Sequence, residues 1–370
     1  MKISSLFLVL SLSLSFVLFG CSKESDSDSG SGIYTFINIE GASVFGIGTT
    51  SSSSSLRMTV NEGVLLVIDA DGEVSVVNDE AVVSSIDAVT DGVIVTLDDG
   101  SIYYLNVDGT QNLVETSGDF VGENSEGNIF FSDASIYSPE DDEVTELNTT
   151  LENVSVEMMS GNFAVITDGE ISQVFDTVTA ERENVDRCNG PGIAALSTTM
   201  VLVNDCGDDP LMDMSDGGSR SDIAESNPRP EHINPNFYEV DDGAIFLSQS
   251  CPVEGLDYTV CHVAPNGTVT NLVTEASSPG SGSDYFIGNE THFVVRELDK
   301  VWFGERGTDA KNVILDDYNM TSISLSESIV YYLGEDGQGN AVSGMYNIET
   351  EENEALLYEG GVITDITPIN

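Results

Sequence analysis

Pairs of adjacent aspartates are the residues in this chain whose chemistry comes closest to that of a metal site. Carboxylates that cluster at turns, together with backbone carbonyls, supply the hard oxygen ligands that Ca²⁺ prefers. We therefore consider structural Ca²⁺ as the one candidate cofactor, held at or near predicted turns by the pairs Asp98 and Asp99, Asp208 and Asp209, and Asp241 and Asp242. None of them has the spacing of an EF-hand, so turn formation and solvation are the main interpretation, no cofactor is expected, and structural Ca²⁺ is the alternative.

Catalytic signatures are missing from the sequence. It contains no GxSxG, HExxH or Walker motif, and its three histidines, His232, His262 and His292, stand far apart. A fold built from repeats can still gather distant side chains over a central channel. A non-catalytic protein is therefore the main hypothesis, and an enzyme stays the alternative.

Two of the rare basic residues lie in one proline-rich stretch, residues 204–236. The chain has 11 Lys and Arg against 64 Asp and Glu, which gives a formal net charge of −53. An anionic group on a partner would be repelled almost everywhere except near Arg220, Arg229 and His232 in this stretch. We predict an exposed loop beside the fifth and sixth repeats that binds through these residues; the alternative is a loop stapled by Cys206 with no binding role.

The same charge excludes classes of partner. Nucleic acid and anionic membrane surfaces both need basic patches, so neither is expected to bind. The acidic residues are spread along the whole chain. This distribution favours solubility over an acidic-tail mechanism.

The first 20 residues have the pattern of an export signal: Lys2, an apolar stretch at 3–19, and Gly20. The stretch is too short for a permanent membrane helix. The sequence LFGC at 18–21 resembles the lipobox of bacterial lipoproteins. This resemblance implies cleavage before Cys21, acylation of its thiol with a palmitate-type chain and anchoring to a membrane. A secretory signal with a chance cysteine is the alternative.

Residues 21–32 follow as a polar tether, since a segment almost without apolar side chains cannot offset its ordering entropy. By resemblance to lipoprotein sorting patterns, Ser22 instead of Asp favours the outer membrane of the cell envelope. The periplasmic and the surface side both stay open. Residues 33–370 are then the folded domain.

Four further cysteines remain in this exported chain, and an even number predicts disulfides. The pairing of neighbours, Cys188 with Cys206 and Cys251 with Cys261, closes the shortest loops, and two other pairings are open. No CxxC spacing occurs, so a zinc or redox site is not expected.

A short apolar run recurs eight times and must organise the fold. The runs begin at residues 64, 93, 129, 163, 200, 244, 293 and 329, at intervals of 29 to 49 residues. Each is rich in Val, Ile, Phe or Tyr and bounded by Gly, Asp, Asn or Ser, as in a strand that is apolar on both faces. Within 92–114, the dipeptides Asp99-Gly100 and Asp108-Gly109 separate three predicted strands, because Asp-Gly favours tight hairpins. Asp-Gly recurs at 71, 91, 168, 242 and 336.

These features predict an all-β protein, a β-propeller of about eight, alternatively seven, antiparallel blades. The rival is an array of β-sandwiches, which would need linkers that are not visible. The last segment, residues 362–369, is expected to close the ring by pairing with strands around 33–39 or 56–60. The run TTSSSSS at 49–55 is predicted to be a loop.

Tyr103 and Tyr104 before Asp108-Gly109 resemble the blades of PQQ-like and lipoprotein-receptor-type propellers. Trp302 is the single tryptophan. The closing tryptophan of each PQQ-type blade is therefore missing, and neither that cofactor nor an alcohol-dehydrogenase activity is implied. Some outer-membrane assembly lipoproteins are eight-bladed propellers that act as scaffolds, which is an analogy of fold and anchor.

Our first hypothesis is a lipid-anchored envelope propeller that acts as a non-catalytic binding platform for an envelope protein or a glycan. The alternative is a propeller hydrolase or lyase that acts on envelope or extracellular polysaccharide. A cluster of polar side chains from three blades around one pocket favours the enzyme, whereas an exposed apolar patch favours the platform.

Overall fold

The repeated apolar runs become strands that are buried on both faces. In the fourth run, Phe163 and Val165 pack against the next sheet along the chain, and Ala164 and Ile166 pack against the preceding one. All four side chains are fully buried. A strand with two apolar faces needs a sheet that is covered on both sides, so the sheets stack on one another.

A computed structural model describes this arrangement for residues 34–36, 39–40, 42, 44–54, 57–69, 72–78, 80–185, 192–203, 211–221, 233–248, 259–272, 283–297, 300–306, 308, 312–316, 318–359 and 361–369. All of them belong to the unit Tyr34–Asn370. Across these ranges, no helix has the length and apolar character that a membrane span requires.

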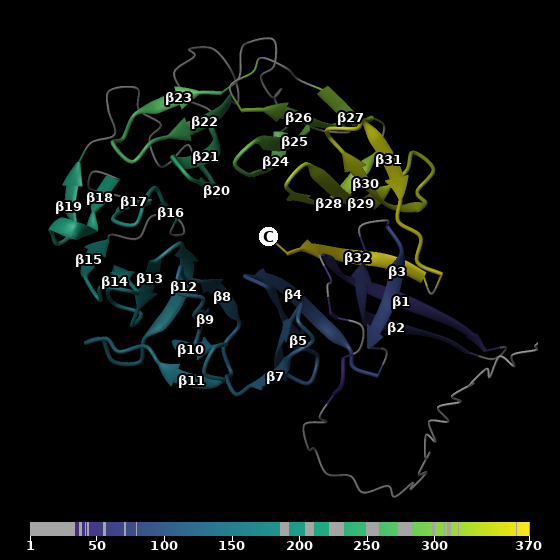
Figure 1. Cartoon of the computed structure of the whole chain (residues 1–370), viewed down its shortest axis with the longest axis horizontal. Helices are drawn as coiled ribbons and strands as arrows, with labels where there is room; N and C mark the ends of the chain where they lie inside the picture. Colours follow the sequence, from purple (N-terminus) through teal and green to yellow (C-terminus); the bar gives the residue numbers. More distant parts are fainter. Residues whose placement is uncertain are drawn as a thin grey trace, which may run out of the picture. The chain divides into compact units, whose positions relative to one another are not determined.

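Within the described residues, the strands form eight antiparallel sheets of four strands each, the blades of a β-propeller (Figure 1). Blade 1 consists, from its inner to its outer edge, of β32 (Gly361–Pro368), β1 (Val44–Ser54), β2 (Arg57–Ile68) and β3 (Val74–Asn78). Blade 2 consists of β4 (Val83–Val89), β5 (Gly92–Leu97), β6 (Ile102–Asn106) and β7 (Gln111–Val114). Blade 3 consists of β8 (Phe120–Glu123), β9 (Ile129–Phe131), β10 (Ser135–Ser138) and β11 (Glu143–Glu146). Blade 4 consists of β12 (Ser155–Ser160), β13 (Phe163–Thr167), β14 (Ser172–Asp176) and β15 (Arg182–Val185).

The second half of the ring repeats this order. Blade 5 consists of β16 (Ile193–Ala195), β17 (Met200–Val203), β18 (Leu211–Asp213) and β19 (Ser219–Ser221), with the 3-10 helix η1 (Met214–Asp216) between its last two strands. Blade 6 consists of β20 (Ile233–Val240), β21 (Gly243–Ser248), β22 (Thr259–Val263) and β23 (Val269–Asn271). Blade 7 consists of β24 (Ser283–Gly288), β25 (His292–Glu297), β26 (Lys300–Glu305) and β27 (Asn312–Asp316). Blade 8 consists of β28 (Asn319–Ser326), β29 (Ile329–Glu335), β30 (Ala341–Asn347) and β31 (Glu352–Ala355).

The inner strands close the ring. Each inner strand contacts that of the next blade, and β32 contacts both β28 and β4. Eight separate apolar clusters fill the eight interfaces between successive blades. The predicted propeller is therefore confirmed, with eight blades and not seven.

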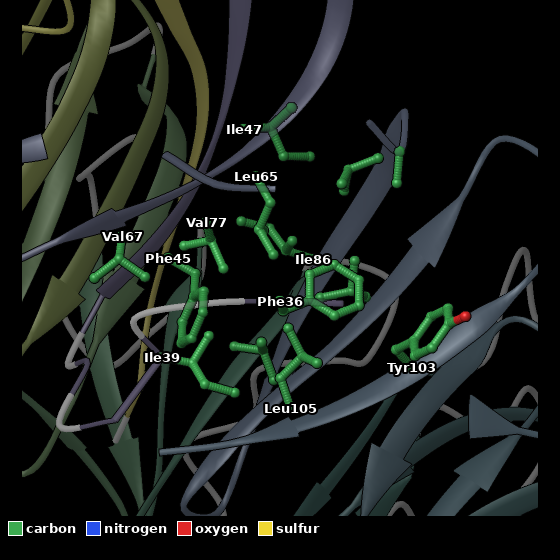
Figure 2. Close-up of a cluster of buried hydrophobic side chains, with 14 of the residues drawn as sticks. Phe36, Ile39, Phe45, Ile47, Leu65, Val67, Val77, Ile86, Tyr103 and Leu105 are labelled. Carbon is green, nitrogen blue, oxygen red and sulfur yellow. The ribbon is translucent and has the colours of Figure 1, made fainter. Parts of the chain in front are cut away.

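The interface between blades 1 and 2 has an additional layer. Phe36 and Ile39, which precede β1, are buried there against Tyr103 and Leu105 of β6 (Figure 2). The ring of Phe36 meets that of Tyr103 edge to face, with centroids 5.2 Å apart. The Phe36 N–H donates a hydrogen bond to Gln111 Oε1 at 2.9 Å. This segment therefore packs across the interface at which the ring closes.

Ring closure by the C-terminal strand is confirmed, but its partner differs from the expected ones. β32 pairs with β1, from Val44 opposite Pro368 to Thr50 opposite Gly361. The serine-rich run is also not a loop, because Thr49–Ser54 belongs to β1 and pairs with β2 as far as Ser54 opposite Arg57. The ladder joins backbone groups, so polar side chains do not prevent it.

Two further expectations change. The run at 64 lies on β2, the third strand of its blade, whereas the other seven lie on second strands, which explains the short first interval of 29 residues. The stretch 204–236 is not one loop, since residues 211–221 complete blade 5 as β18, η1 and β19. The physical reason is alternating burial: Leu211 packs toward blade 6, and Met212 and Met214 pack toward blade 4.

The Asp-Gly dipeptides have two structural roles. Gly100 and Gly109 adopt positive φ, 85° and 96°, in the predicted turns of blade 2. Gly92 instead begins β5, and a Cβ built on it would lie 2.2 Å from the Leu105 carbonyl oxygen. Glycine is therefore required at that position by close backbone approach and not by the turn.

Candidate functional site

In blades 2 to 8, the turns that join the first strand to the second lie at the same end of the ring, which we call the turn face. Hydrogen bonds link neighbouring turns there. The Thr90 N–H donates to Glu123 Oε2 at 2.7 Å, joining blades 2 and 3, and the Ser125 N–H donates to Asn162 Oδ1 at 2.9 Å, joining blades 3 and 4. These bonds fix the turns relative to one another, so the face is pre-organised.

Glu239, at the end of β20, links blade 6 to blade 4. The Ser160 hydroxyl donates a hydrogen bond to its carboxylate, and the Ala195 N–H donates to Ser160 Oγ at 2.7 Å. The link passes blade 5, whose inner strand has only three residues. Desolvation raises the pKa of Glu239, and the hydrogen bond from Ser160 opposes this shift.

Asp242 lies in a charged cluster between blades 6 and 7. Arg306 Nη2 donates to Asp242 Oδ1 at 2.7 Å, and His262 Nε2 lies 3.1 Å from the same oxygen. Arg306 also binds the Glu290 carbonyl oxygen at 3.0 Å. The hydrogen bond from Arg306 holds the pKa of Asp242 below its usual value. The guanidinium of Arg306 therefore already pairs with this predicted calcium ligand.

The other described candidates for calcium binding lie in turns: Asp98 and Asp99 follow β5, and Asp241 follows β20. Asp99 Oδ1 accepts a hydrogen bond from the Ser101 N–H at 2.9 Å, and the Asp241 N–H donates to Glu290. In the part of the chain that the structure describes, no group of three or more His, Cys, Asp or Glu side chains is arranged to hold a metal ion. Asp208 and Asp209 lie outside the described residues, and Ca²⁺ binding stays a prediction.

The predicted basic site is described at one position. Arg220 is in β19 and donates a hydrogen bond to the Asn184 carbonyl oxygen in β15, so it joins the outer strands of blades 5 and 4. Arg229 and His232 lie outside the described residues. Whether the three residues bind a partner together stays a prediction.

Cys261 is fully buried in β22 and forms a disulfide. The predicted partner, Cys251, lies outside the described residues, as do Cys188 and Cys206. The pairing therefore stays a prediction, and so does acylation of Cys21, which also falls outside the description.

A pocket of about 720 Å³ lies on the turn face over blades 6, 7 and 8, and the end of the chain also contributes to it. Its apolar wall comes from Tyr238, Ile287, Leu325 and Ile369. The chain end lies at the centre of the ring in Figure 1. The polar residues that line the pocket are Glu239, Asn289, Glu290, Thr291, His292, Ser326, Glu327, Ser328 and Glu349.

Hydrogen bonds hold the pocket walls in place. Asn289 Nδ2 donates to the Glu327 carbonyl oxygen at 2.8 Å, which ties blade 7 to blade 8. The Tyr238 hydroxyl donates to the Phe286 carbonyl oxygen at 2.9 Å, which ties blade 6 to blade 7. A ligand would therefore meet walls that need little ordering on binding.

The carboxylates of the pocket fall into two groups. Glu239 is engaged by Ser160, and Glu290 by Arg306 and the Asp241 N–H. Glu327 and Glu349 make hydrogen bonds through their backbone, and within the described residues their carboxylates have no hydrogen bond or ion pair. These two acids of blade 8 are the groups that can meet an incoming ligand.

The sequence did not predict this pocket. Glu327 and Glu349 stand in turns without a motif, and the sequence pattern places Ile369 only in the closing strand. The pocket could have been found by aligning the repeats strand by strand. Such an alignment places residues 289–291 and 327–328 at equivalent turns, between the first and second strands of neighbouring blades. His292 also belongs to no sequence motif, and its Nδ1 lies 2.8 Å from the Thr291 hydroxyl.

Comparison with known proteins supports the fold. No family model and no curated protein matches the chain. Among solved structures, the dihydro-heme d1 dehydrogenase NirN in complex with DHE is similar over 92% of this chain and 77% of its own, with 6% identity and a TM-score of 0.55. TolB from Acinetobacter baumannii is similar over 88% of this chain at 13% identity and a TM-score of 0.40, and this chain spans 66% of it. BamB from Moraxella catarrhalis is similar over 77% of this chain and 87% of its own, with 14% identity and a TM-score of 0.39. At such low identity the similarity to NirN shows the fold alone: the protein is a β-propeller.

Proposed function

We propose that the protein is a lipid-anchored platform of the bacterial cell envelope that binds a partner in the turn-face pocket of blades 6 to 8. The observation that carries the proposal is the pocket itself, about 720 Å³ with residues from three blades and the chain end around it. Its size lies in the range of ligand sites, and it combines an apolar wall with a few polar groups.

The fixed geometry of the turns favours binding. Three contacts hold the three blades in fixed positions around the pocket: the hydrogen bonds of Asn289 and Tyr238 and the ion pair of Arg306 with Asp242. Pre-organised walls lower the entropic cost of binding, which gives a rigid scaffold its advantage over a flexible loop. The export signal, Cys21 and the polar tether would place this face in the envelope.

Site-specific crosslinking in intact cells tests the proposal. A photoreactive amino acid is placed at Ser328 in the pocket, and in a matched variant at Glu140, an exposed residue at the outer part of blade 3. We expect a discrete crosslinked species from Ser328 that is absent from Glu140. The same products from both positions, or no product from Ser328, would overturn the proposal.

An enzyme acting on polysaccharide is the second candidate, because polar side chains from three blades do surround one pocket. The pair with catalytic chemistry is Thr291 and His292, whose imidazole lies at 2.8 Å from the hydroxyl. Release of reducing ends from envelope polysaccharide that is lost in His292→Gln would favour this candidate, and no release by the intact protein would exclude it for that substrate.

A further inference from the structure

We propose that the turn-face pocket takes a basic peptide segment, with a Lys or Arg head group at Glu327 and Glu349 and an apolar neighbour against Ile369. This inference rests on the proposed function and specifies the class of its partner. Among the described residues, the lining of the pocket includes four glutamates and no Lys or Arg. The charge complement of such a wall is a cation.

The glutamates differ in what they can still bind. Glu290 is occupied by Arg306, and Glu239 by Ser160, so both act as fixed parts of the wall. Glu327 and Glu349 belong to two turns of the same blade and are not engaged in this way. A guanidinium or ammonium group docking there would replace water on carboxylates that no cation of the described residues neutralises.

The apolar wall distinguishes a peptide from a simple ion. Tyr238, Ile287, Leu325 and Ile369 line the pocket beside the carboxylates. Lys and Arg side chains place their methylene stems on apolar surface while the charged head remains among polar groups. A divalent cation would gain nothing from that wall and needs a set of converging carboxylates, which the described residues do not provide.

The position of the pocket favours a segment of a larger partner. The net charge of −53 attracts cations to the whole surface, so long-range attraction alone brings a basic segment near without choosing a place. The pocket adds local contacts from blades 6, 7 and 8, and it is open on the turn face, so both ends of a peptide can continue outward.

Fluorescence anisotropy with a defined probe tests this. The probe is a labelled eight-residue peptide of alternating Leu and Lys, added to the mature chain in detergent. The variant is Glu327→Gln with Glu349→Gln. Its matched control, Glu115→Gln with Glu146→Gln, removes the same charge from a second hollow at the rim of blades 2 and 3. A third variant, Ile369→Ser, removes the apolar contact.

We expect the pocket double variant to bind the probe about fivefold more weakly, from two partly exposed ion pairs, and the rim control to change less than about twofold. Ile369→Ser should weaken binding of the peptide probe and leave binding of the polyamine spermine unchanged. Equal losses in both double variants would overturn the proposal, because general charge attraction would explain them. Unchanged peptide binding in Ile369→Ser would overturn it in favour of a free polyamine.

The two proposals fail separately. A crosslink at Ser328 without discrimination between the double variants would keep the binding platform and reject the basic segment. Loss of the Ser328 crosslink would reject the platform itself. Unchanged circular dichroism and unfolding midpoints in all variants show that any loss arises in the pocket and not from unfolding.

Discussion

Replacing Asp87 by Asn should stabilise the protein at neutral pH. Asp87 lies on β4, the inner strand of blade 2, beside the closing strand β32, which carries Asp365. Burial raises the pKa of Asp87 to about 6, a hydrogen bond from Ser85 opposes the shift, and the charges of Asp365 and Asp119 add to it. Burial raises the pKa of Asp365 as well. The seam at which the ring closes therefore holds carboxylates that resist ionisation.

The sign of the effect follows from proton linkage. The folded protein holds the Asp87 proton more tightly than the unfolded chain does, so stability falls as the pH rises from about 4 to about 6, and the penalty is complete above that range. A shift of about 2 units corresponds to about 3 kcal/mol at most. Because Asp87 is only half-buried, solvent screening reduces this to about 1 to 2 kcal/mol.

Urea unfolding at pH 7.5 and pH 5.0 measures the difference between wild type and Asp87→Asn. We expect the variant to be more stable by about 1 to 2 kcal/mol at pH 7.5 and by roughly half as much at pH 5.0. Asp98→Asn removes one negative charge from an exposed turn and is the matched control. If both variants gain equally, relief of net charge explains the result and the argument about the seam is refuted.

Three further predictions concern other parts of the chain. Phe36→Ala should cost about 3 to 5 kcal/mol in the same unfolding assay, because it opens a cavity between blades 1 and 2; an unchanged midpoint would show that the segment before β1 does not stabilise the ring. Gly243→Ala should cost about 1 to 3 kcal/mol, since the new Cβ would lie 1.9 Å from the Val263 carbonyl oxygen; wild-type stability would contradict the close approach. Cys21→Ser should move the protein from the detergent phase to the aqueous phase, because the thiol is needed for acylation; unchanged partitioning would refute the anchor.

The blades could be predicted because their signal is local. Val93, Ile94, Val95 and Leu97 form an apolar run, and Asp99-Gly100 supplies a turn shortly after it, so strand, turn and next strand are all visible within 20 residues. Stacking then follows, since a strand with two apolar faces needs two covering sheets. The number of blades equals the number of runs.

The errors arise where a strand is identified by its partner and not by its own side chains. Thr49–Ser54 has no apolar pattern, and it is a strand because β2 supplies its hydrogen bonds. Similarly, Leu211 and Met212 are only two adjacent apolar residues, too few for a recognisable strand pattern, and the neighbouring blades on both sides bury them. Single-sequence patterns cannot show which distant segment will supply a ladder or a covering face.

The candidate site depends on contacts between residues that are far apart in the sequence. Asp242 has the composition of a calcium ligand, yet its partner Arg306 is 64 residues away and arrives with blade 7. Glu239 reaches Ser160, 79 residues away, past a whole blade. Such distances are set by the stacking of blades, so they become predictable only when the phase of every repeat is known.

Ring closure and the pocket are physically connected. The same strand, β32, supplies the inner edge of blade 1 and leads directly to Ile369 in the pocket wall. On its two sides, the Thr367 hydroxyl donates to the Ile86 carbonyl oxygen of β4 at 3.3 Å, and the Ser324 hydroxyl of β28 donates to the Ile366 carbonyl oxygen at 2.8 Å. These contacts hold the strand that leads to Ile369 in the closed ring. A partner that binds Ile369 therefore binds the closed ring in preference to the open chain, so binding at the turn face must stabilise closure by mass action.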